Sequence, residues 1–371
     1  MRFSAPGKIL LLGGYSVLDD YPALSIAVED RMGLGVSAEC REGGFRVVSR
    51  QFSIDRNIDP EGRLADCRDS SSCAFMAALS YLRGKCVVLK PVTIETRNSL
   101  IFGNRREKSG LGSSAASTVA IVAAVLGWHG IEDMNVVHKV SQIANYLSTK
   151  KTGAGFDVAC SVFGTIRYRR FGERAISLNR AGGDAFDRHI VSLVESDWPG
   201  MEVEPFSMGD YGILAFNIRG SRTRTIGAIK AMGRFKEAKP GDYARMVSRQ
   251  AEAEELVFDG ILAGDGGMVR KGMRKAREIQ RRLSAEVEKL ADFDPIEPKE
   301  LTITIDEAEK LDGIVAGRCP GAGGYDSLAF IVKRGADEGQ LAGRIAQIGK
   351  DAGIRLERIE LVLSKDGVKR L

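Results

Sequence analysis

The first part of the chain consists of short apolar or β-branched runs separated by turn residues. Such runs are typical of strands. Five strands are predicted, at residues 9–12, 23–28, 33–38, 45–49 and 87–96. Helical spacing of apolar residues is rare before residue 70, so the chain is expected to begin with a sheet.

Three helices are predicted next. Residues 70–82 have helical spacing behind a serine-rich start, and residues 113–126 form an almost uninterrupted small and apolar run. A helix without a polar face must be buried nearly all round. Residues 133–148 form a third helix; after a break at 150–155 come a short apolar helix and a strand at 165–171.

The pattern weakens from residue 184 to residue 204, where only isolated strands are expected. We therefore predict two lobes, 1–184 and 185–371. The second begins with a strand at 212–218 and continues through amphipathic helices to about residue 290. Its last part is predicted as a strand at 327–332, a helix at 338–351 and a strand at 354–363, which gives an α+β lobe.

Composition limits the class of protein. Of 371 residues, 44% are hydrophobic and 28% charged, as in ordinary globular proteins, and single cores tend to split beyond ~250 residues. The net charge of +5 comes from 54 basic and 49 acidic residues that are mixed along the chain, so no nucleic-acid arm is expected. The oligomeric state is left open.

No apolar run approaches the ~18 residues that a membrane span needs, and the N-terminus has no secretory pattern. A soluble, unprocessed, cytoplasmic protein is expected. The six cysteines are scattered and are expected to be reduced thiols. Three histidines without metal-ligand spacing make a histidine-built metal site improbable, so any metal should arrive with a nucleotide.

The strongest local signal is a glycine-serine loop that leads into the helix at 113–126. Glycine backbones can close around a phosphate, and a helix start adds partial positive charge. The loop is neither a Walker A motif nor a dinucleotide fingerprint. The alternative is a tight turn with serine N-caps. The candidate residues for phosphate are Lys108, Gly110, Leu111, Gly112, Ser113, Ser114 and Ala115.

Three further segments are weak signals when each is taken alone. Lys8 precedes the apolar strand at 9–12 and is by itself most simply a surface lysine. Asp157 lies just inside an apolar helix, either as a charge favoured by the helix dipole or as a catalytic carboxylate. Residues 320–326, Pro-Gly-Ala-Gly-Gly-Tyr-Asp, are a turn or a binding loop.

In this order and spacing, these segments resemble the GHMP kinase family over nearly the whole chain. The stretches at 155–159, 168–171, 296–298 and 320–326 are similar to the phosphomevalonate kinase branch. The resemblance implies a two-lobed fold, with an N-terminal lobe like domain 2 of ribosomal protein S5 and a ferredoxin-like C-terminal lobe. It also implies ATP-dependent phosphorylation in isoprenoid precursor synthesis.

The same resemblance implies roles for single residues. The loop backbone would hold the ATP phosphates, Ser114 would reach Mg²⁺, and adenine would lie near Asn98. Asp157 would orient or deprotonate the acceptor, with Lys8 beside it. Gln142 and Asn145 stand where mevalonate kinase has an acidic ligand, and either could assist the metal. Acceptor contacts are expected from Tyr15, Arg169, Ser221, Arg222, Gly323, Gly324 and Asp326.

The expected acceptor is 5-phosphomevalonate, a small anion that arginines can bind with paired donors. Further candidate cations are Arg105, Arg106, Arg167, Arg170 and Arg224. Three alternatives remain open: 5-phosphorylation of 3-phosphomevalonate, another GHMP-type reaction such as that of a sugar kinase, and a non-catalytic binding module. Residue types do not separate the two phosphorylated acceptors.

Overall fold

The computed structural model describes residues 1–50, 53–62, 67, 69–103, 109–178, 183–219, 225–291 and 293–371. It divides into two compact units. Unit 1 contains Met1–Ile9, Ser25–Pro205 and Ser364–Leu371, and unit 2 contains Leu10–Leu24 and Phe206–Leu363. The predicted lobes, 1–184 and 185–371, differ from these units in three places. Residues 10–24 lie in unit 2, residues 364–371 return to unit 1, and unit 1 continues to Pro205.

The extension of unit 1 beyond residue 184 has a local cause. Where isolated strands were predicted, the chain forms helix α5 (Asp184–Glu195). Its buried Asp187 accepts from Ser80 and from Arg83 Nε at 2.7 Å, both on α1 (Ser70–Gly84). The sequence pattern failed here because a polar residue occupies one of the few buried positions of this helix.

Unit 1 contains a six-stranded sheet of order β15-β1-β4-β7-β5-β6. Its pairs are antiparallel except β5 with β7. The strands are β1 (Arg2–Ala5), β4 (Val36–Arg41), β5 (Arg46–Ser49), β6 (Ile54–Asn57), β7 (Thr93–Asn98) and β15 (Lys369–Arg370). A second sheet includes β2 (Gly7–Leu12), β3 (Ala23–Asp30), β8 (Ile166–Arg169) and β9 (Glu202–Pro205).

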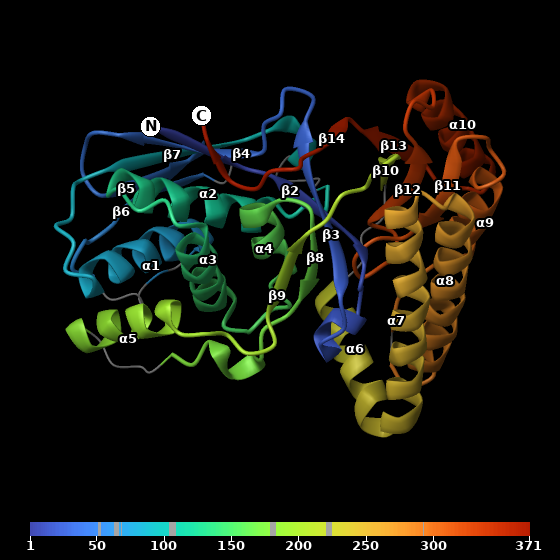
Figure 1. The fold of residues 1–371 in the computed structure, drawn as a ribbon, viewed down its shortest axis with the longest axis horizontal. Helices are drawn as coiled ribbons and strands as arrows, with labels where there is room; N and C mark the ends of the chain where they lie inside the picture. The colour runs from blue at the N-terminus through green and yellow to red at the C-terminus, as the bar shows by residue number, and fades with distance from the viewer. Residues whose placement is uncertain are drawn as a thin grey trace. The chain divides into compact units, whose positions relative to one another are not determined.

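The helices of unit 1 gather beside these sheets (Figure 1). They include α2 (Ser113–Trp128), α3 (Met134–Thr149) and α4 (Phe156–Phe163). Every residue of α2 from Ala115 to Gly127 is buried, as its composition predicted. Asp69 and Asp133 cap α1 and α3 by accepting backbone N–H groups, which satisfies donors that a helix start leaves open.

The sequence prediction of a strand at 87–96 was too long, because β7 begins only at Thr93. Val88 in the preceding stretch is 82% exposed, so this apolar residue is not part of the core. The single strand predicted at 354–363 is divided into β13 (Leu356–Ile359) and β14 (Leu361–Leu363).

Unit 2 contains an antiparallel sheet of order β11-β12-β10-β13. Its other strands are β10 (Tyr211–Ile218), β11 (Ile314–Arg318) and β12 (Ser327–Lys333). The long helices α7 (Pro240–Ala263) and α8 (Gly266–Glu288) run side by side (Figure 1). The unit also has η1 (Ser16–Asp19), α6 (Thr225–Ala238), α9 (Lys299–Ala308) and α10 (Glu338–Asp351).

The cysteine prediction was wrong for one pair, because Cys67 and Cys73 form a disulfide. Cys73 lies in the first turn of α1, and the chain turns at the N-cap Asp69, so the two Cα atoms are 5.1 Å apart. Cys40, Cys86, Cys160 and Cys319 are free thiols, of which only Cys86 is exposed. Within the described ranges, no helix is both long and apolar enough to cross a bilayer.

Candidate active site

The glycine loop of unit 1 ends at an open helix terminus. Gly112 is the N-cap of α2 and has a φ of 77°, a left-handed conformation that glycine adopts without strain. Among the described residues, no side-chain hydrogen bond caps this helix start, so the predicted alternative of a serine-capped turn is not observed there. Ser113 is partly buried and Ser114 is exposed. The terminus therefore presents backbone donors and a hydroxyl, which suits an anion.

Lys8 binds this loop from strand β2. Its Nζ donates to the Gly110 carbonyl at 2.9 Å, and its backbone N–H donates to the Leu111 carbonyl at 2.8 Å. A Cβ on Gly112 would lie 3.1 Å from two carbons of the Lys8 side chain. The lysine, which the sequence alone placed on the surface, thus lies along the phosphate loop.

Asp157 stands in the first turn of α4, behind Gly155, which has a φ of 79°. Its Oδ1 accepts from the Val158 N–H at 3.0 Å. The Lys8 ammonium group lies 5.7 Å from the ring centroid of the neighbouring Phe156. Burial raises the pKa of the Cys160 thiol to about 12, and Lys8 and Asp157 act on it with opposite signs. Lys8 therefore lies beside the first turn of α4, which contains Asp157.

The glycine before α4 cannot be replaced easily. A Cβ on Gly155 would lie 2.7 Å from the Tyr168 hydroxyl and 3.0 Å from Gln142 Nε2. Gln142 Nε2 donates to the Gly155 carbonyl at 2.8 Å and lies 3.0 Å from His138 Nε2. Gln142, which the sequence offered as a possible aid to magnesium, is instead buried and supports the chain before Asp157.

The remaining predicted residues of unit 1 lie on strands. Asn98 is the last residue of β7. Arg169 on β8 forms an ion pair with Glu202 on β9, with Nε and Oε2 at 3.2 Å. The neighbouring Arg170 is only 4% exposed and lies 3.6 Å from Glu173. Both arginines are therefore ion-paired, and only Arg170 is also buried.

The predicted acceptor residues of unit 2 lie around residues 320–326. The Tyr15 hydroxyl donates to the Ala322 carbonyl at 2.9 Å, and burial raises the pKa of this phenol well above its ordinary value. Gly323 and Gly324 have φ values of 77° and 74° and are buried. Asp326 is partly buried. Tyr15 therefore holds the glycine loop in place.

Several candidates lie outside the described residues, namely Lys108, Arg105, Arg106, Ser221, Arg222 and Arg224. Sequence reasoning missed the buried residues Glu254, Gln280 and Arg318 of unit 2. Glu254 accepts from the Gly13 N–H, and Arg318 donates to Glu254 and to Gln280. Isolated Glu, Gln and Arg residues on helices and a strand carried no signal, because their partners are far away in the sequence.

Comparison with known proteins supports the class inferred from these features. The family described as GHMP kinases N terminal domain matches residues 70–165. This range contains α1, α2, α3, α4 and the glycine loop that precedes α2. The predicted resemblance to GHMP kinases is confirmed, and with it the α+β fold of that class.

Several of the similar curated proteins are phosphomevalonate kinases, and others are mevalonate kinases. The phosphomevalonate kinase of Gibberella zeae is 26% identical, with 96% of this chain and 97% of that protein covered, and that of Saccharolobus solfataricus is 26% identical, with 96% and 99% covered. Among solved structures, a Listeria innocua protein has a TM-score of 0.80 at 19% identity and full coverage of this chain. The alignment also covers 99% of the Listeria chain.

A second solved structure is described as Streptococcus pneumoniae phosphomevalonate kinase in complex with phosphomevalonate and AMPPNP. Its TM-score is 0.71 at 17% identity, and the alignment covers 97% of this chain and 100% of the Streptococcus chain. At these identities, the solved structures establish the fold.

Proposed function

We propose that this protein transfers the γ-phosphoryl group of ATP to 5-phosphomevalonate, giving 5-diphosphomevalonate and ADP. The observation that carries the proposal is the hydrogen bond from the Lys8 ammonium group to the Gly110 carbonyl, beside the start of α2, which no described side chain caps. The full-length similarity to phosphomevalonate kinases supports the acceptor.

The residues of unit 1 have complementary tasks in this reaction. Phosphoryl transfer depends mainly on positioning and on neutralising negative charge. Backbone N–H groups from Gly112 to Ala115 bind phosphate oxygens, and Lys8 offsets the charge that develops on the transferred group. Asp157 orients the acceptor. A phosphate oxygen is already ionised near neutral pH, so this acceptor needs little general-base help.

Magnesium fits the residues present. No group of three or more His, Cys, Asp or Glu side chains in the described part of the chain could hold a metal ion alone. Mg²⁺ usually keeps several waters and binds through few protein ligands together with substrate phosphates. The exposed hydroxyl of Ser114 is the proposed ligand, and the ion would supply charge neutralisation.

The remaining site residues are proposed for each unit by itself. In unit 1, Arg169 is proposed to contact the acceptor, and Asn98 is proposed to lie near the adenine of ATP. In unit 2 the proposed acceptor contacts are Tyr15, Gly323, Gly324 and Asp326, to which Ser221 and Arg222 belong by sequence. A cytoplasmic location is part of the proposal.

The test is a screen of ADP formation with mevalonate, 5-phosphomevalonate, 3-phosphomevalonate, homoserine and galactose, with phosphorus NMR of the product. Two coupled diphosphate resonances are expected with 5-phosphomevalonate. Turnover of 3-phosphomevalonate alone would reassign the attacking group to an alcohol. Turnover of galactose alone, or a folded protein that binds no ATP·Mg²⁺ in calorimetry, would overturn the proposal.

A further inference from the structure

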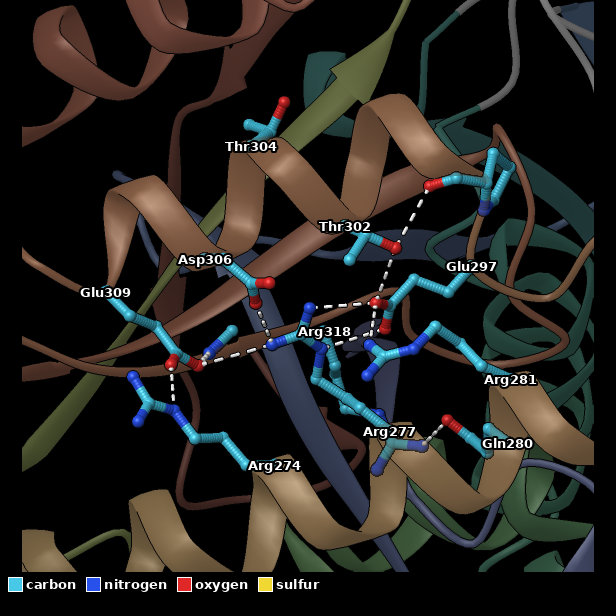
Figure 2. A network of polar contacts seen from close by, with 12 residues as sticks. Arg274, Arg277, Gln280, Arg281, Glu297, Thr302, Thr304, Asp306, Glu309 and Arg318 are labelled. Carbon is cyan, nitrogen blue, oxygen red and sulfur yellow. Dashed lines mark hydrogen bonds and ion pairs between the residues drawn. The ribbon is translucent and has the colours of Figure 1, made fainter.

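Glu297 lies between α8 and α9, and its side chain is only 2% exposed. Its oxygens accept from Arg277 Nε and Nη2, each at 2.8 Å (Figure 2). Oε1 also accepts from Arg281 Nη1 at 2.6 Å and from Thr302 Oγ1 at 3.0 Å. Burial alone would raise the pKa of Glu297, but bonds and charges from Arg277 and Arg281 lower it. This carboxylate is therefore ionised and fully bonded.

Arg277 extends the contacts from α8 to the end of β11. Its Nη1 lies 2.9 Å from Asp306 Oδ1 on α9 and 3.7 Å from Glu309 Oε1. Glu309 accepts from the Gly317 N–H at 3.1 Å, and Gly317 lies three residues before Pro320. Figure 2 shows these side chains converging from both helices. The network thus leads to the start of the glycine loop at 320–326.

The loop at 320–326 is hydrogen-bonded to the backbone of Ile296, the residue before Glu297. The Ile296 carbonyl accepts from the Gly324 N–H at 2.7 Å, and the Ile296 N–H donates to Ser284 Oγ at 3.1 Å. A Cβ on Gly323 would lie 2.3 Å from the Ile296 oxygen. The loop therefore follows the position of Ile296 closely.

A separate set of contacts holds the other half of the loop. The Gly321 N–H donates to the Leu10 carbonyl at 2.9 Å. Arg318 donates to Glu254 Oε1 at 3.0 Å, and Glu254 Oε2 accepts from the Gly13 N–H at 3.0 Å. The two halves of the loop are thus held by different backbone partners, Leu10 and Ile296.

We propose that Glu297 and Arg277 form a positioning pair that holds the Ile296 carbonyl against Gly324 and so sets the conformation of residues 320–326 for acceptor binding. Apolar side chains of similar volume would stabilise the interior as well as a buried ion pair does. They could not fix the direction of a carbonyl. Only the acceptor assignment rests on the proposed function, because the dependence of the loop on Glu297 is a property of unit 2.

Hydrogen exchange tests the positioning without substrate. In Glu297→Gln, which keeps the size and loses the charge, the Gly324 amide should exchange about tenfold faster, whereas the Gly321 amide should change by less than about twofold. The matched control is Glu278→Gln, which alters an exposed pair with Arg282 on the same helix and should change neither amide.

Equal acceleration of both amides and of unit 2 as a whole would reduce the pair to a general stabiliser, and an unchanged Gly324 amide would also overturn the proposal. If Glu297→Gln does not fold, Arg281→Ala gives the same contrast more mildly, since it removes one of the four bonds to the carboxylate.

Steady-state kinetics test the acceptor assignment. Glu297→Gln should raise the KM for 5-phosphomevalonate about tenfold, with kcat within about threefold and the KM for ATP within about twofold of the parent. A rise in the KM for ATP instead would overturn the assignment. A variant with a small defect elsewhere in the core of unit 2, Ile345→Val, should leave both KM values unchanged. If the parent protein does not phosphorylate 5-phosphomevalonate, the proposed function is wrong. The difference in exchange between the Gly324 and Gly321 amides still tests whether Glu297 and Arg277 position the loop.

Discussion

The contacts of Lys8 in the folded chain suggest a role that its neighbours in the sequence do not reveal. Both its backbone and its side chain donate to the phosphate loop, at Leu111 and Gly110. These partners lie about a hundred positions further along the chain. Antiparallel and crossover pairings of the sheets bring them together, and the lysine charge is then held beside a helix start.

Lys8→Met is therefore expected to lower kcat about a hundredfold, which is the usual cost of removing one group that stabilises developing charge. Stability should change little, because the methionine side chain can follow the same path along Gly112. Steady-state kinetics and urea unfolding measure both effects. Lys90→Met, at an exposed lysine of unit 1, is the control. A kcat within threefold of the parent would exclude Lys8 from the reaction.

At the scale of elements, the proposed phosphate site depends on the start of α2. The helix has no polar face and is fixed by burial from Ala115 to Gly127. Its first residues are thus placed by packing of the rest of the helix, and we propose that its N-terminus binds the phosphates. Gly112 combines a left-handed backbone with a side-chain neighbour, whereas Gly130, after the other end of α2, has a φ of 84° and no neighbour within 4 Å.

Gly112→Ala and Gly130→Ala should each lower the free energy of unfolding by about 1 kcal/mol, because alanine resists the left-handed region. Only Gly112→Ala should also raise the KM for ATP, about tenfold, since its Cβ would press on Lys8. Chemical denaturation and ATP titration measure the two effects. An equal rise in both variants would mean that strain alone matters.

At the scale of the molecule, the free energy of unfolding at acidic pH should depend on a buried histidine, His138. His138 of α3 packs against Phe163 and Trp198, with ring centroids 5.2 and 6.3 Å apart. Gln142 Nε2 lies against its Nε2, and Lys139 is the neighbouring charge. Burial lowers the pKa of His138 from 6.5 to about 3. Between pH 6.5 and about 3, this ring is therefore neutral in the folded protein and protonated in the unfolded chain.

Stability from His138 is complete above pH 6.5 and is lost as the pH falls toward the folded pKa of about 3. One differential proton corresponds to about 1.4 kcal/mol per pH unit. His138→Leu should reduce the pH dependence of the free energy of unfolding between these two pH values, by up to that amount per pH unit. Denaturant unfolding at several pH values measures it. An unaltered slope in the variant would show that His138 is not the group that titrates.

Much of the fold was predictable from local pattern. The helices α1, α2, α3 and α10 and the strand β12 were predicted within a few residues, because each buries a continuous apolar face or run. Helix α5 and the late start of β7 were not predictable. In α5 the buried residue Asp187 is polar, and before β7 the apolar residue Val88 is exposed.

For the site, the sequence by itself determined the glycines, the serines, Lys8 and Asp157, because a backbone that approaches phosphate needs small residues and a charged reaction needs charged groups. Only the tertiary structure decided which partners these residues have. It placed Lys8 on the loop and Gln142 under Gly155, joined Cys67 to Cys73, and seated Gly324 on Ile296. The Lys8–Gly110 contact joins residues 102 positions apart, whereas the two cysteines are only 6 positions apart. Both contacts depend on the path of the folded chain, which local periodicity does not encode.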